Sequence, residues 1–240
     1  MPVLLRLLYG RTISKKGAAS GRHGLQATRL AVLRNLSVED MGSFLDIATG
    51  KLKDVKVVGA SKKIFEEPIL PIRKQVGFLN MISSVISELG SNATPYLETL
   101  LNAVLYCLVF ACRQLSGQGV DPENAPEEEE KASTQSLLRV VRSTGLKCLI
   151  ALFQNAQSFQ WAPYQDIILE DVVAPRLDNL PSEMTQGVSG MLQLFATWSV
   201  LPRIALFLAP HGKIPEGILP KVIECLSIVK GKDEVKIHVL

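Results

Sequence analysis

The chain has 240 residues, 47% of them hydrophobic and 20% charged, and its 13 prolines are spread along its length. This composition excludes a disordered chain and argues against a membrane bundle, while the length allows one or two compact domains or a short array of repeats. The formal net charge of +3 is too small to indicate a uniformly basic surface.

The positive charge is concentrated in the first quarter of the chain. Residues 1–63 contain 12 Lys or Arg and 4 Asp or Glu, a net charge of +8, whereas residues 64–240 contain 14 and 19, a net charge of −5. This asymmetry indicates a surface near the N-terminal end that faces a polyanion, with simple solvation of that end as the alternative.

Residues 10–24 form the most distinctive basic segment. They contain no acidic residue and no apolar period, and their cations lie among Gly, Ser and Ala, which predicts a flexible basic loop. Such cations suit a phosphate backbone, because each Lys or Arg that neutralises a phosphate releases condensed counterions. Contact with an acidic protein and plain solvation are the alternatives. Few aromatic residues lie nearby, so we expect contacts led by charge or shape rather than base stacking.

The sequence therefore predicts RNA-binding residues in the loop and shortly after it. These are Arg11, Lys15, Lys16 and Arg22 in the loop, and Lys51 and Lys53 beyond it. Other cations lie near them in the sequence, at Arg29, Arg34, Lys56, Lys62 and Lys63.

Helical periodicity dominates from residue 71 onward. Apolar residues at spacings of three and four predict a helix over 72–89 that begins at Pro71 and ends at Gly90. A second helix, with Thr94 as N-cap and Pro95 at its first position, runs to residue 115 and is apolar on almost every side. Its most apolar window, residues 100–112, is bounded by charged residues and is too short to span a bilayer, so no membrane contact is expected.

Residues 117–131 interrupt the helical pattern. Their acidic residues repel one another, and their two prolines break regular structure. This composition predicts an acidic disordered insertion, solvated between helices. A helical stripe then resumes over 138–152, where Gly145 indicates a close helix crossing. Three further helices are predicted: from Pro163 to a bend or end at Pro175, from an N-cap at Ser182 to Trp198, and from Leu219 to Gly231.

The spacing of these helices indicates a repeat architecture. The intervals are counted between the starts of successive helical units. Once the acidic segment is set aside, three of the four lie near the roughly 40–47 residues of a HEAT-type helix pair. Both ends of the chain carry apolar residues without caps. We therefore predict an all-α, HEAT-like helical-repeat solenoid segment, with residues 1–240 being part of a longer α-solenoid and a closed helical bundle as the alternative.

No catalytic or metal-binding constellation is recognisable in the sequence. The three histidines are scattered, the four cysteines lie in apolar stretches typical of reduced core thiols, and Ser189 lies in a helical pattern as a small packing residue. The sequence thus predicts no enzyme activity, no metal, no cofactor and no small-molecule substrate.

The N-terminal sequence resembles a known family. Residues 4–11, Leu-Leu-Arg-Leu-Leu-Tyr-Gly-Arg, followed by the basic Gly-rich stretch, are similar to the down-regulated-in-metastasis family, the giant U3-snoRNA-associated HEAT-repeat protein of the small-subunit processome. The similarity touches most of the chain, although the acidic segment lies outside the family pattern. It continues through residues 44–46, 75–80, 96–97, 145–147 and 198–199.

The resemblance implies a non-enzymatic scaffold in the 90S pre-ribosome that supports 18S rRNA processing and assembly. It implies a location in the nucleus and nucleolus, pre-rRNA or U3 snoRNA and other pre-ribosome proteins as partners, and no catalytic residues. The alternative is a HEAT solenoid that binds protein cargo or assembly partners without RNA contact.

Overall fold

The computed structural model describes residues 31–117, 128–183 and 189–226. Within these ranges every regular element is helical, apart from an isolated antiparallel bridge between His211 and Ile214. The prediction of an all-α fold is confirmed. The basic loop of residues 10–24, residues 118–127 of the acidic segment and the apolar ends of the chain lie outside the described residues.

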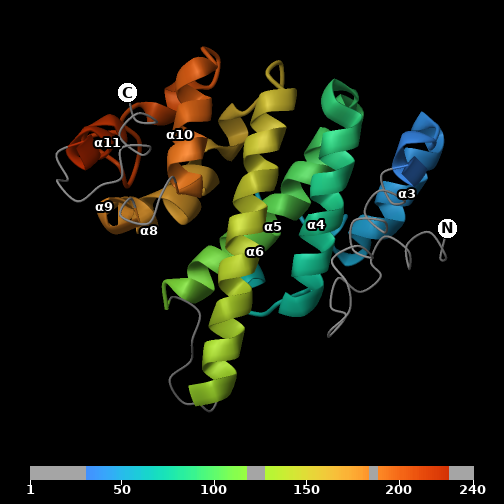
Figure 1. Ribbon diagram of the computed structural model, residues 1–240, viewed down its shortest axis with the longest axis horizontal. Helices are drawn as coiled ribbons and strands as arrows, with labels where there is room; N and C mark the ends of the chain where they lie inside the picture. Colours follow the sequence, from blue (N-terminus) through green and yellow to red (C-terminus); the bar gives the residue numbers. More distant parts are fainter. Residues whose placement is uncertain (1–30, 118–127, 184–188, 227–240) are drawn as a thin grey trace.

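α3, α4, α6, α10 and α11 lie in this order along the long axis of the molecule (Figure 1). α6 packs against α4, α5 and α10, whereas α4 and α5 make little direct contact with each other. The first and last labelled helices lie at opposite ends, whereas a closed bundle would bring them together. This arrangement favours the solenoid, and the assignment to HEAT repeats stays a prediction. The main helices are α3 (Val38–Thr49), α4 (Ile72–Leu89), α5 (Leu97–Leu115), α6 (Glu128–Asn155), α10 (Gly190–Val200) and α11 (Leu219–Leu226).

The predicted bounds of α4 are confirmed. Pro71 is its N-cap, and Gly90 ends it with a φ of 51°, a left-handed value that glycine tolerates best. The start of α5 differs from the prediction. Thr94 and Pro95 belong to a 3₁₀ helix, Gly90–Tyr96, and α5 begins only at Leu97.

α5 is the central helix of the fold. Every residue from Leu100 to Cys112 is buried, as its apolar pattern predicts. Together with the preceding turn it forms a stretch, Asn92–Leu115, that is long and apolar enough to cross a membrane. The prediction that this apolar segment is too short to span a bilayer is therefore wrong. However, 78% of its most apolar window is buried inside the fold, as expected for a core helix covered by its neighbours.

Gly145 marks the close crossing of α5 and α6 that the sequence predicts. A Cβ atom at this position would lie 3.2 Å from Cβ of Leu108. α6 is longer than expected, because it begins at Glu128. The prediction of disorder is therefore wrong for residues 128–131.

The chain after α6 is irregular around Pro175. A 3₁₀ turn (Ala162–Tyr164) leads into α7 (Gln165–Ile167), a π-helical segment (Ile168–Val173) and α8 (Ala174–Leu177). Pro175 has no N–H to donate one turn back, so the helical ladder is already perturbed upstream of it. The helix therefore does not end at Pro175. The irregularity that the proline causes is the π-helical segment before it.

The helix predicted over 182–198 is divided in two. α9 (Leu180–Glu183) is separate, and α10 begins at Gly190 with Ser189 as its N-cap. The Ser189 hydroxyl accepts a hydrogen bond from the backbone N–H of Leu192, at 3.3 Å. Ser189 is thus a capping residue, not a packing residue. The predicted end of α11 at Gly231 lies outside the described residues.

The four cysteines are buried and free, as predicted. Burial raises the pKa of Cys112 to about 11 and that of Cys148 to about 12, and it also raises the pKa of Cys107 and Cys225. These thiols therefore stay protonated and behave as small apolar core residues.

Candidate nucleic-acid interface

The connection between α3 and α4 carries the densest group of lysines among the described residues. We call residues 50–63 the lysine connection. It contains one acidic residue, Asp54, against five lysines whose side chains are all exposed: Lys51, Lys53, Lys56, Lys62 and Lys63.

Buried apolar residues fix the backbone of the lysine connection. Two short 3₁₀ helices, Gly50–Leu52 and Lys62–Phe65, place Leu52 and Phe65 in the core, and Val57 is buried between them. The hydroxyl of Ser61 caps the second turn by accepting from the backbone N–H of Lys63. The lysines therefore alternate with residues that hold the segment to the body of the protein.

Polar side chains of α5 complete this anchoring. Oδ1 of the buried Asn102 accepts a hydrogen bond from the backbone N–H of Val57, at 3.1 Å. The hydroxyl of Tyr106, one turn along the same face, accepts from the backbone N–H of Ile69, at 2.8 Å. The otherwise apolar α5 thus supplies hydrogen-bond acceptors for backbone N–H groups that have no partner in regular secondary structure.

The end of α5 holds the residues that directly follow the lysine connection. Gln114 Nε2 donates to the backbone oxygens of Phe65 and Glu66, at 3.4 and 3.2 Å. The Phe65 ring stacks on Tyr106, with 5.8 Å between centroids. Because the backbone is already ordered, binding through the lysines loses only side-chain freedom.

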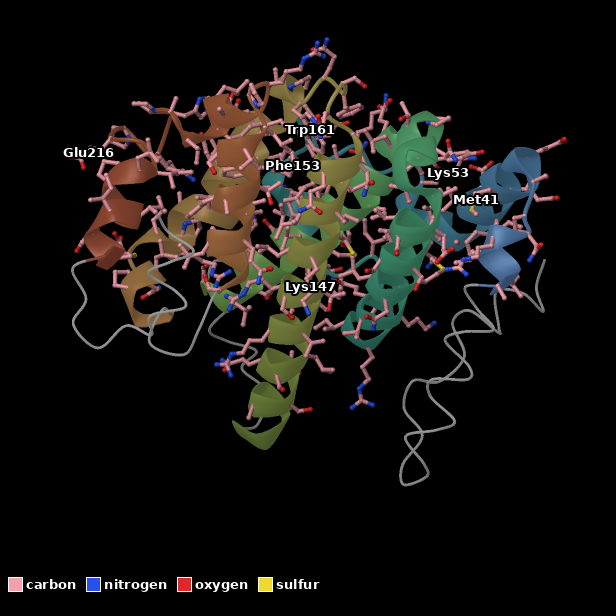
Figure 2. All side chains as sticks on the ribbon, turned by 45° about the horizontal axis from the view of Figure 1, so that its top comes forward. Met41, Lys53, Lys147, Phe153, Trp161 and Glu216 are labelled. Carbon is pink, nitrogen blue, oxygen red and sulfur yellow. The ribbon has the colours of Figure 1, made fainter. Side chains whose placement is uncertain are left out.

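Most charges of the lysine connection are available to a ligand. Lys53 lies beside α3 (Figure 2) and forms a salt bridge with Asp46, at 2.9 Å, in which both side chains are about half exposed. Such a pair is weak in water. Among the described residues, no carboxylate lies within ion-pair distance of the other four lysines. The connection therefore presents exposed ammonium groups that can neutralise phosphates.

The structure brings together two of the six sequence-predicted binding residues. Lys51 and Lys53 lie in the lysine connection, whereas Arg11, Lys15, Lys16 and Arg22 lie outside the described residues. Of the other cations noted in the sequence, Arg29 is also outside them, and Arg34 pairs with Glu88, which raises the pKa of the guanidinium group.

Sequence reasoning missed the anchoring residues. Asn102, Tyr106 and Gln114 are separated by multiples of four residues, which places them along a stripe that turns slowly around the helix. That spacing of polar groups in an apolar helix was the available signal. Among the described residues, no group of three His, Cys, Asp or Glu side chains is arranged to hold a metal ion.

Comparison with known proteins places the chain in a family. All 240 residues match the family described as U3 small nucleolar RNA-associated protein 20, N-terminal. The chain belongs to this family. The resemblance seen in the sequence is therefore confirmed.

Two relatives carry the name U3 small nucleolar RNA-associated protein 20. The protein from Schizosaccharomyces pombe is 29% identical over 204 residues, which cover 82% of this chain and 8% of the relative. The protein from Saccharomyces cerevisiae is 27% identical over 211 residues, which cover 87% of this chain and again 8% of the relative. The chain thus spans about 8% of the length of these relatives.

A third similarity is to a protein with a different name. Trigger factor from Gloeobacter violaceus is 27% identical over 206 residues, which cover 84% of this chain and 43% of that protein. The family match over the whole chain decides the assignment.

Proposed function

We propose that this chain is a non-enzymatic scaffold segment of the small-subunit processome, or 90S pre-ribosome, that supports 18S rRNA processing and assembly in the nucleolus. Its partners are pre-rRNA or U3 snoRNA and other pre-ribosome proteins. Family membership supports the assembly, since the relatives are named for their association with U3 small nucleolar RNA. The main helices, which lie side by side along the long axis with α3 and α11 at opposite ends, suit an extended scaffold (Figure 1).

The observation that carries the RNA contact is the anchored lysine connection. Its exposed ammonium groups stand on a backbone that Asn102 holds, and Tyr106 and Gln114 hold the residues that follow it. The nearest aromatic ring, Phe65, is buried and therefore cannot stack on a base. This combination suits contact with phosphates and not the reading of bases. The sequence-predicted cations Arg11, Lys15, Lys16 and Arg22 are further RNA-binding residues in this proposal.

Filter binding to an RNA hairpin tests the contact. The variant Lys62→Ser/Lys63→Ser removes two charges from the connection, and Arg203→Ser/Lys213→Ser removes two exposed charges near the other end of the chain as a matched control. For contacts with a duplex-like surface, the slope of log affinity against log salt should fall by about 0.9 per lost contact in the first variant only. Equal slopes for the two variants and the wild type would mean that the lysines are merely solvated.

Protein contact without RNA is the second candidate, and a groove between α6 and α10 favours it. The groove has a volume of about 420 Å³, and its lining includes Ile150, Leu201 and three glutamines but no charged residue. Val200 at its rim is 74% exposed. Capture of pre-ribosome proteins that persists after nuclease treatment, together with unaltered binding by the lysine variant, would support this candidate.

A further inference from the structure

The second half of α6 is covered on three sides and open on the fourth. A Cβ atom at Gly145 would lie 3.2 Å from Cβ of Leu108, so this side of α6 packs on α5. The Cys148 thiol donates to a backbone oxygen of α4, at 3.5 Å. Leu146 lies about 200° around the helix from Cys148, and its Cδ2 is 3.5 Å from the place of a Cβ at Gly190, the first residue of α10. α6 therefore passes in front of α5, between α4 and α10 (Figure 1).

The open side carries one charged residue. It continues onto α10, and we call it the α6–α10 face, which consists of Ser143, Lys147, Ala151 and Gln154 of α6 and Gln193 and Val200 of α10. The sequence around this face is also uncharged, since residues 75–87 of α4, 148–155 of α6 and 190–200 of α10 contain no Asp, Glu, Lys or Arg. Depletion of charge is typical of the buried centre of a protein interface.

The groove between α6 and α10 lies on this face. It has a volume of about 420 Å³, and Val200 at its rim is 74% exposed. The side chains of Gln154, Gln157 and Gln193 line it, and within the described part of the chain their carboxamides have no hydrogen-bond partner. The groove therefore offers an apolar contact together with neutral donors and acceptors.

Lys147 is the isolated charge of the α6–α10 face. Its side chain, labelled on α6 in Figure 2, is exposed. No carboxylate of the described residues lies within ion-pair distance of it. An ammonium group that a partner covers loses water and has to be paired. A protein surface that complements this face therefore has one carboxylate at this position and uncharged side chains around it.

We propose that the α6–α10 face docks an α-helix of another protein, whose contacting side is apolar and uncharged apart from one Asp or Glu that pairs with Lys147. This inference rests on the protein contacts of the proposed function and is independent of its RNA contact. A groove between two helices accepts the side chains of a third helix, and helical surfaces offer no strand edge to an extended peptide.

Two other occupants fit the charge pattern less well. RNA has closely spaced phosphates, which the single cation of this face cannot neutralise. A second copy of the chain, packed about a two-fold axis, would bring two Lys147 side chains to one surface that has no carboxylate to pair with them.

Carbodiimide crosslinking of intact pre-ribosomes that contain the full-length protein tests the proposed pair. The reagent joins an amine to a carboxylate in direct contact through an amide bond and leaves as its urea. Peptide mapping should find Lys147 linked to an Asp or Glu in an otherwise uncharged helical segment of another protein. Replacement of that carboxylate by Lys should weaken the association, and combination with Lys147→Glu should restore it.

A matched pair of variants tests the groove. Val200→Asp places a charge on the α6–α10 face at an exposed position, whereas Ile223→Asp does so at a 62% exposed position of α11, outside the face. Val200→Asp should abolish the Lys147 link and reduce recovery of the linked protein about tenfold or more. Ile223→Asp should match the wild type, and nuclease treatment should leave the link in place.

The other outcomes overturn the proposal. A link from Lys147 to another copy of this chain would make the face a dimer interface, and a link within one molecule would mean that the chain covers its own face. Loss of the link after nuclease treatment would assign the face to RNA. Links at other exposed lysines but none at Lys147, with equal yields for the two variants, would show an uncovered surface. Absence of the full-length protein from pre-ribosomes would instead overturn the proposed function.

Discussion

α5 and the lysine connection show two ways in which sequence determines structure. α5 is ordered by its own apolar pattern, since every residue from Leu100 to Cys112 is buried. The lysine connection has no long helix, and its order comes from buried Leu52 and Val57 and from a hydrogen bond to Asn102 of α5. The comparison teaches that a core helix can also serve as the anchor of a functional surface.

The largest expected effect comes from breaking the core helix. Leu108 is completely buried where α5 crosses α6, so Leu108→Asp places an unpaired carboxylate in the core. This costs several kcal/mol, comparable to a domain's whole stability of about 5–15 kcal/mol, and should unfold the chain. Circular dichroism during heating measures this loss of stability as a change in the melting temperature. Val200→Asp, at an exposed position of α10, is the control and should melt like the wild type.

The close crossing at Gly145 offers the next largest effect. Gly145→Leu forces a side chain into the place of Leu108 and should destabilise the chain by about 1–3 kcal/mol. Gly77, in α4, has no atom within 4 Å of its added Cβ, so Gly77→Ala should instead stabilise by up to about 1 kcal/mol. Urea denaturation compares the two. Equal effects of both substitutions would show that the crossing is loose.

A smaller effect sharpens the role of the anchor. Tyr106→Phe removes the hydroxyl that accepts from the backbone N–H of Ile69 and leaves that donor without its partner. The expected loss of stability is about 1–2 kcal/mol. Hydrogen exchange of the Ile69 amide should accelerate, while amides in the middle of α10 should keep their rates. Unchanged exchange at Ile69 would mean that the hydroxyl does not hold the connection.

A further effect appears only at alkaline pH, and it is absent near pH 7. Because burial raises the pKa of Cys112 to about 11, its thiol stays protonated in the folded chain but ionises near pH 8.5 when unfolded. The stability that this burial contributes is present below about pH 8.5 and is lost as the pH rises toward 11. Cys112→Ala should therefore weaken the fall of stability over that interval. Denaturant midpoints measured from pH 8 to 11 for both proteins decide this.

The sequence predicts regular helices well and the interface only in part. The bounds of α4 and the crossing at Gly145 follow from local patterns and from the small size of glycine. The break between α9 and α10 does not, because the apolar stripe continues across it and only the cap at Ser189 distinguishes it. The lysines are visible in the sequence, but their anchoring depends on α5 side chains about 40 residues or more away, as the pairing of Val57 with Asn102 shows.

The ion pair between Arg113 and Asp171 was also beyond sequence reasoning. Arg113 lies in the last turn of α5 and Asp171 in the π-helical segment, 58 residues later. Nothing local marks such residues as neighbours. They meet because α5 packs against both α6 and the π-helical segment. Long-range packing, which a single sequence does not specify residue by residue, creates this part of the surface.

Photochemical crosslinking of the intact chain to U3-containing RNA, followed by peptide mapping, tests the central claim most directly. If the anchored lysine connection contacts RNA, crosslinked peptides should include residues 51–63 and should lose that crosslink in Lys62→Ser/Lys63→Ser. Peptides from α11 serve as the internal reference and should carry no comparable signal. Crosslinks confined to regions other than the connection, with identical yields for the wild type and the lysine variant, would contradict an RNA contact at this surface.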